Sequence, residues 1–135
     1  FGGFGKQDNL YILPPDNISC SNCETMLAFS NEQIQPITLF GATGANILNE
    51  GDLDGDGGEE ISVLPLGAAK PELIVYSYKR GQWVKLATFK VNRTQLMSNV
   101  DARKQAVELA GPGYIYAQEA AGDTTIQQKL NIWQY

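Results

Sequence analysis

The sequence predicts an all-β, mainly antiparallel domain: a small sandwich, a barrel or a propeller-blade-like module with at most one short helix. Apolar residues alternate with polar ones in short runs, as in strands that bury one face. Turn-forming residues separate these runs at intervals of about 8–12 residues. The 135 residues are enough for one hydrophobic core, and no linker-like tract divides them, so we expect a single domain over residues 1–135.

The expected strands follow one another with a turn residue after each. Pro14 and Gly41 stop two of the early runs, and the later runs are richer in β-branched and aromatic side chains. Gly81 suits a hairpin turn over residues 79–82, because glycine adopts a positive φ without strain. In the first two thirds of the chain we expect strands at residues 10–13, 26–29, 37–40, 61–66, 73–78 and 83–91.

Residues 99–110 fit two different structures. Asn99 is a suitable N-cap, and helix-forming residues follow it. In the alternative, residues 105–110 form a strand that turns at Gly111-Pro112-Gly113 into a second strand at 114–118. We favour this hairpin, with a short helical turn near 98–104. The alternation over residues 130–135 predicts the last strand.

The composition excludes several functions. The chain has no histidine, which removes Ser-His-Asp and Cys-His nucleophile systems and histidine-containing zinc sites. A general acid or base would have to be a carboxylate, lysine, tyrosine or cysteine. A net charge of -5 repels phosphate, so we expect no nucleic-acid partner. Since no apolar run approaches the ~20 residues that cross a bilayer, we expect no membrane span.

The segment Asp52-Leu53-Asp54-Gly55-Asp56-Gly57-Gly58-Glu59-Glu60 carries the most informative pattern. Alternating aspartates can aim three carboxylates at one point, and the glycines let the chain bend between them. Ca²⁺ binds about six to eight hard oxygens, whereas Mg²⁺ keeps more of its water. The segment is not an EF-hand, because Val63 stands where that loop needs a glutamate. The alternative to a Ca²⁺ site is a solvated Asp/Gly turn that binds nothing.

Residues 50–61 resemble the Ca²⁺ loop of FG-GAP/VCBS-type repeats, found in integrin-like β-propellers, whose pattern D-x-D-x-D-G-x-x-D/E leads into an apolar strand. The resemblance implies a backbone carbonyl ligand near Gly58 and a solvent-facing Glu59. It covers about residues 45–91, and the loop occurs once, so we expect one blade-like unit and not a closed propeller. The side-chain ligands that it implies are Asp52, Asp54, Asp56 and Glu60.

Cys20 and Cys23 form a C-x-x-C pair. A four-thiolate zinc site would need a second pair, and the strand-then-helix context of a thioredoxin-like redox site is missing. We therefore predict a local disulfide in an exported protein, with free thiols as the alternative.

Aromatic residues on the alternating strands have flat faces that suit carbohydrate binding. Because alternation turns half of them inward, we predict packing roles for most of the set Tyr76, Tyr78, Trp83, Tyr114, Tyr116, Trp133 and Tyr135.

The sequence thus predicts a non-enzymatic calcium-binding β-domain of a secreted, periplasmic or cell-surface protein. In this hypothesis Ca²⁺ rigidifies a scaffold that recognises a protein or carbohydrate ligand. The alternative is a hydrolase, or an accessory domain of an extracellular enzyme, that uses carboxylates as catalysts.

Overall fold

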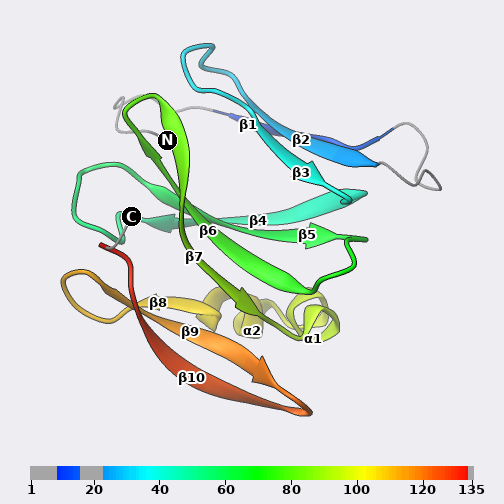
Figure 1. Cartoon of the computed structure of the whole chain (residues 1–135), viewed down its shortest axis with the longest axis vertical. Helices are drawn as coiled ribbons and strands as arrows, with labels where there is room; N and C mark the ends of the chain where they lie inside the picture. Colours follow the sequence, from blue (N-terminus) through cyan, green and yellow to red (C-terminus); the bar gives the residue numbers. More distant parts are fainter. Residues whose placement is uncertain (1–8, 16–22, 134–135) are drawn as a thin grey trace.

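The computed structural model describes residues 9–15 and 23–133. This part of the chain contains ten strands in three antiparallel sheets, together with two short helices (Figure 1). The first sheet contains β1 (Leu10–Leu13), β2 (Glu24–Phe29) and β3 (Ile37–Phe40). The central sheet contains β4 (Gly44–Gly51), β5 (Glu60–Leu66), β6 (Glu72–Lys79) and β7 (Gln82–Lys90). The third sheet contains β8 (Val107–Leu109), β9 (Tyr114–Ala121) and β10 (Thr124–Asn131), and the helices are α1 (Arg93–Ser98) and α2 (Val100–Gln105).

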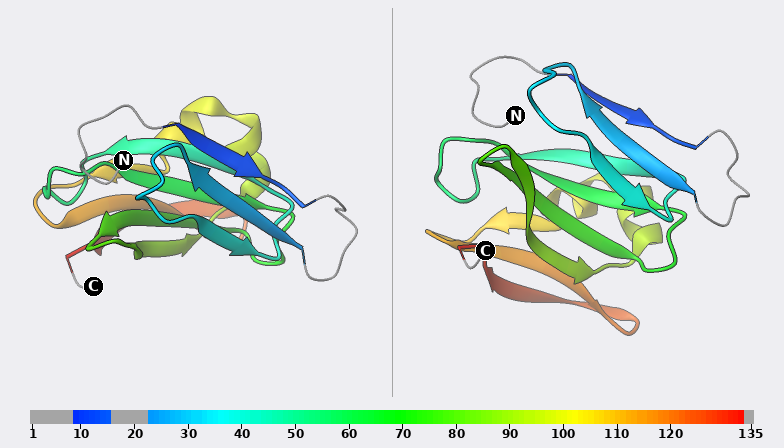
Figure 2. Two further views of the ribbon diagram at one scale, coloured as in Figure 1. Left: turned by 90° about the horizontal axis from the view of Figure 1, so that it is seen from above. Right: turned by 45° about the horizontal axis from the view of Figure 1, so that its top comes forward.

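The central sheet lies between the other two sheets (Figures 1 and 2). One apolar cluster fills the space between the first sheet and the central sheet. A second cluster joins the central sheet to the helices and the third sheet. Both faces of the central sheet are therefore buried, which explains why the strands β5 and β6 are almost continuously buried.

The all-β, antiparallel fold class is confirmed, but the structure has two helices where we expected at most one. The Asn92 side chain caps α1, accepting a hydrogen bond from the N–H of Gln95 at 3.0 Å. The Asn99 side chain caps α2 in the same way, accepting from the N–H of Ala102 at 3.1 Å. Both structures considered for residues 99–110 occur in succession, because α2 ends at Gln105 and β8 begins at Val107.

Two strands differ from the prediction. β4 was not expected as a separate strand, because its sequence has no clear alternation and its residues are mostly half-buried. The last strand in the described part of the chain is β10, at 124–131 and not at 130–135. A tight turn at Gly122 pairs Ala121 with Thr124, so β10 begins earlier than its apolar residues indicate. Its first half is exposed and, apart from Ile126, polar, so it gives no alternation signal.

The four strands of the central sheet form an antiparallel meander in the order β4-β5-β6-β7, over the range expected for a blade-like unit. Alternation along β5 and β6 separates two sets of side chains. Ile61, Val63, Ile74, Tyr76 and Tyr78 belong to the cluster beneath the first sheet. The intervening positions face the helices and the third sheet, and they include the polar residues that build the site described next.

Candidate metal centre

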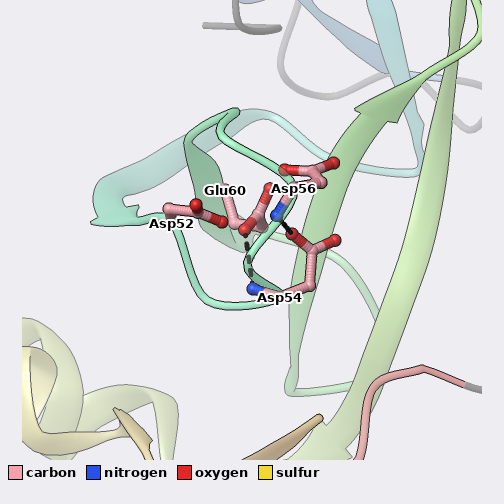
Figure 3. A group of neighbouring side chains, drawn as sticks. All are labelled: Asp52, Asp54, Asp56 and Glu60. Atoms are coloured by element: carbon pink, nitrogen blue, oxygen red, sulfur yellow. Dashed lines mark hydrogen bonds between the residues drawn. The ribbon is translucent and has the colours of Figure 1, made fainter. Parts of the chain in front are cut away.

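Four carboxylates gather in the loop between β4 and β5. One ligand oxygen from each of Asp52, Asp54, Asp56 and Glu60 lies within 4.8 Å of the others, and the side chains converge in Figure 3. Asp54 and Glu60 are buried, with 6% and 0% of their surface exposed, whereas Asp52 and Asp56 are exposed. The four predicted side-chain ligands thus lie together, two inside the protein and two at its surface.

Glu60 closes the base of this loop. Its Oε1 atom accepts hydrogen bonds from the N–H groups of Leu53 at 2.7 Å and Asp54 at 3.2 Å. Its Oε2 atom accepts from the Ser77 hydroxyl at 2.8 Å. Leu53 is 6% exposed and packs into the cluster between the central and third sheets. The loop is therefore anchored both by hydrogen bonds to a buried carboxylate and by an apolar side chain.

The exposed part of the loop is held by its own aspartates. Asp52 accepts from the N–H groups of Gly55 at 2.8 Å and Gly57 at 2.9 Å. Both glycines have positive φ, at 79° and 89°, a conformation that other residues rarely adopt. Asp54 accepts from the N–H of Asp56 at 3.3 Å. These bonds curl the chain so that its acidic side chains lie on the inside of the turn.

Burial and neighbouring charges shift the titration of two of the carboxyls in opposite directions. Burial raises the pKa of Glu60 to about 7, and the charge of Asp54 adds to this rise. Partial burial also acts to raise the pKa of Asp56, but hydrogen bonds from Lys79 and from the N–H of Gly58 outweigh it, so this pKa is lowered. The buried Glu60 carboxyl is thus costly to ionise without a nearby cation, and the exposed Asp56 carboxyl is not.

Lys79, at the end of β6, reaches into the acidic loop. Its Nζ lies 2.5 Å from Asp54 Oδ2 and 2.6 Å from Asp56 Oδ2. Sequence reasoning did not assign a role at the site to Lys79 or Ser77, which lie well beyond the loop in sequence. The available signal was the alternation in β6, where Ser77 interrupts an apolar run and Lys79 shares its face two residues later.

Glu59, which we predicted to face solvent, and Gly58, near which we predicted a carbonyl ligand, lie beside the cluster. Glu59 is exposed and accepts a hydrogen bond from Asn49 Nδ2 at 2.5 Å, so its side chain faces away from Glu60, as the alternation at the start of β5 predicts. Gly58 is buried and its N–H donates to Asp56 at 2.8 Å. A backbone carbonyl ligand near Gly58 stays a prediction.

The loop also contacts the segment that follows β10. The indole N–H of Trp133 donates to the backbone carbonyl of Asp54 at 3.0 Å. The same ring lies so close to Gly113 that a Cβ added there would be 2.7 Å from it. Trp133 therefore links the acidic loop to the turn before β9, a contact between residues 79 positions apart.

A buried polar network lies next to the loop. Arg103 on α2 is 5% exposed and donates to Asn46 Oδ1 at 2.6 Å and to the Ser62 hydroxyl and carbonyl, each at 2.9 Å. Ser62 in turn donates to Glu50 at 2.6 Å, two residues before Asp52. Burial raises the pKa of Glu50 against the opposing effects of Ser62 and Arg103. The network joins α2 to the two strands that carry the loop.

The other predicted residues are only partly described. Cys23 is 4% exposed, whereas Cys20 lies outside the described residues, so their disulfide stays a prediction. Among the aromatic residues, Tyr76 and Tyr78 are buried, and Trp83 stacks on Phe29 with 5.1 Å between ring centroids.

The remaining aromatic residues lie nearer the surface. Trp133 is 55% exposed, Tyr114 is 38% exposed and Tyr116 is half-buried. Tyr135 lies outside the described residues.

Comparison of the chain with protein-family models, with curated proteins and with solved structures found no match. Within the described residues, neither helix has the length and apolar character needed to cross a membrane. The case for a function therefore comes from the geometry of the acidic loop.

Proposed function

We propose that this chain is a non-enzymatic calcium-binding β-domain of an exported protein, with Asp52, Asp54, Asp56 and Glu60 as side-chain ligands. One observation carries the proposal: an oxygen from each of these residues lies within 4.8 Å of the others. Two of the four residues are buried. Carboxylates brought this close repel one another, and a bound divalent cation would relieve that repulsion.

The donor set favours Ca²⁺ over Mg²⁺. The loop offers four carboxylates from one short segment, and glycines stand between the last three of them. Ca²⁺ accepts many oxygen ligands at variable angles, whereas Mg²⁺ requires a near-ideal octahedron and retains several waters. Because most of the ligands come from the chain itself, the larger ion suits the loop better.

The position of the loop supports a scaffolding role for the ion. The loop joins the first two strands of the central sheet and leads into the apolar strand β5, as the loop pattern of an FG-GAP/VCBS-type repeat leads into an apolar strand. An ion held there would fix the ends of β4 and β5 and, through Trp133, the segment after β10. Exposed apolar side chains such as Phe40, at 77%, offer contact surface for a protein or carbohydrate ligand.

The test is calorimetric titration of chelator-stripped protein with Ca²⁺, with Mg²⁺ as the comparison ion. We expect one ion per chain. If the ion binds only the folded state, a hundredfold excess over Kd raises the free energy of unfolding by about 2.7 kcal/mol. Asp56→Ala should abolish this rise. Glu59→Ala is the matched control, because it removes the neighbouring outward-facing acid and should leave most of the rise intact.

Two results would count against the proposal. If titration with Ca²⁺ produced no heat and the melting temperature did not rise with Ca²⁺, the proposed metal site would be rejected. Equal losses in Asp56→Ala and Glu59→Ala would show that the ligands are assigned to the wrong positions in the loop.

A further inference from the structure

A positively charged side chain of the protein already contacts two of the four carboxylates. The Nζ atom of Lys79 lies 2.5 Å from Asp54 Oδ2 and 2.6 Å from Asp56 Oδ2. The side chains of Lys79 and Asp54 are 14% and 0% exposed, so this ion pair is largely shielded from water. Shielding strengthens the interaction compared with an ion pair on the surface.

We infer that Lys79 is a built-in cation that holds the acidic loop together when no metal is bound and opposes the binding of Ca²⁺. This inference rests on the proposed calcium site and concerns its regulation. Lys79 brings one positive charge to four carboxylates, so it relieves part of their repulsion and leaves the rest for a divalent ion.

The backbone holds Lys79 in this position. Lys79 is the last residue of β6 and pairs with Gln82 across a two-residue turn, in which Arg80 and Gly81 have φ of 53° and 78°. Two positive φ values are typical of the tight turns that join antiparallel strands. Alternation along β6 places Lys79 on the same face as Ser77, which donates to Glu60. The ammonium is therefore directed at the loop by the same strand that anchors the buried ligand.

The inference predicts opposite effects in the two states of the site. Without metal, Lys79 stabilises the folded loop. With metal, it weakens binding, because Ca²⁺ must either displace the ammonium from the two Oδ2 atoms or bind beside a like charge. A purely structural ion pair predicts something else: its loss would disorder the loop and weaken both folding and Ca²⁺ binding.

A weakened site would suit the proposed extracellular setting. Calcium-binding modules outside the cell work with Kd values of about 10⁻⁴–10⁻³ M, far weaker than intracellular sensors. A tethered ammonium lowers affinity toward that range without removing a ligand, and it keeps the loop folded before the ion binds.

The experiment compares Lys79→Met with wild-type protein in two measurements: Ca²⁺ affinity by calorimetry at low salt, and melting temperature in excess chelator. Methionine keeps the unbranched apolar side chain and removes the charge. We expect the variant to bind Ca²⁺ about tenfold more tightly, because the like charge beside the ion is gone. We expect its melting temperature in chelator to fall. Lys79→Arg retains the charge and should keep an affinity close to that of the wild type.

Lys90→Met is the matched control. Lys90 is exposed and pairs with Glu72 at the opposite end of the same two strands, so the variant changes net charge equally without touching the loop. Its affinity should equal that of the wild type. If Lys90→Met and Lys79→Met bound Ca²⁺ more tightly by the same factor, the effect would come from net charge alone and the inference would be overturned.

The remaining outcomes distinguish a failure of this inference from a failure of the calcium proposal. Unchanged or weaker binding by Lys79→Met, with wild-type protein binding normally, would overturn the role of Lys79 and leave the calcium site standing. Failure of both proteins to bind Ca²⁺ would reject the calcium site and, with it, this inference.

Discussion

The two faces of the central sheet are built from the same strands but differ in chemistry. The face toward the first sheet is apolar and aromatic, with Phe29, Tyr76 and Tyr78 packed around Trp83. The face toward the helices and the third sheet has an apolar centre, but it also carries buried polar residues at Glu60, Ser62 and Ser77. Burial of polar groups is unfavourable unless they are hydrogen-bonded. Each of these three residues has a hydrogen-bond partner.

The two faces therefore differ in what their burial requires. The aromatic face gains free energy by removing apolar area from water and needs no exact geometry beyond good packing. The polar face holds carboxylates and an arginine in fixed positions beside the acidic loop, at a cost in desolvation. We interpret this second face as the support of the candidate site, so changes to the two faces should have separate effects.

The largest expected effect is the loss of Arg103. Arg103→Met should lower the free energy of unfolding by about 3–5 kcal/mol, because it leaves Glu50 buried beside Ser62 without its positive charge. Urea denaturation measures this loss. The control is Lys104→Met on the exposed side of the same helix, which should change stability by less than about 0.5 kcal/mol. Similar values for the two variants would show that the buried network contributes nothing to stability.

The aromatic face should lose stability when one of its buried side chains is made smaller. Leu27 on β2 is fully buried in the cluster beneath the first sheet, and Leu27→Ala should cost about 2–5 kcal/mol through lost burial and the cavity left behind. We expect Ca²⁺ affinity measured below the melting temperature to stay at the wild-type value, since the loop lies on the other face. A loss of affinity as large as that of a ligand variant would contradict this separation of the two faces.

The same contrast explains how far sequence reasoning reaches. β7 could be predicted from its local alternation and β6 from its β-branched and aromatic residues, and the acidic loop because its four clustered carboxylates lie within nine consecutive positions. β4 was missed, since its half-buried residues follow no clear period. Alternation in β6 could have placed Lys79 on the same face as Ser77, but the contacts of Lys79 and Trp133 with the loop depend on how distant strands pack, which no local pattern shows.

The ionisation of Glu60 should make the stability of the metal-free protein depend on pH. Its pKa rises from 4.5 to about 7 on burial, so between these values the folded chain holds a proton that the unfolded chain has released. Stability must then fall as pH rises through this window, by at most about 1.4 kcal/mol per pH unit, and level off above it. Melting temperatures in chelator should show this fall relative to Glu60→Gln, which cannot ionise. A constant difference between the two proteins from pH 4.5 to 7 would refute the assignment.

The smallest expected effect concerns the two tryptophans of the chain. One contacts the acidic loop, and the other packs on the aromatic face of the central sheet. Trp133 donates to the Asp54 carbonyl beside the carboxylates, whereas Trp83 donates to Gln35 at 2.6 Å near the first sheet. Trp133→Phe removes one neutral hydrogen bond and should cost about 0.5–1.5 kcal/mol. Ca²⁺ added to wild-type protein should change tryptophan fluorescence, because the ion approaches the residue that Trp133 contacts. The change should vanish in Trp133→Phe and persist in Trp83→Phe. The reverse pattern would show that the ion acts on the aromatic face, and the two faces would then have to be treated as one coupled unit.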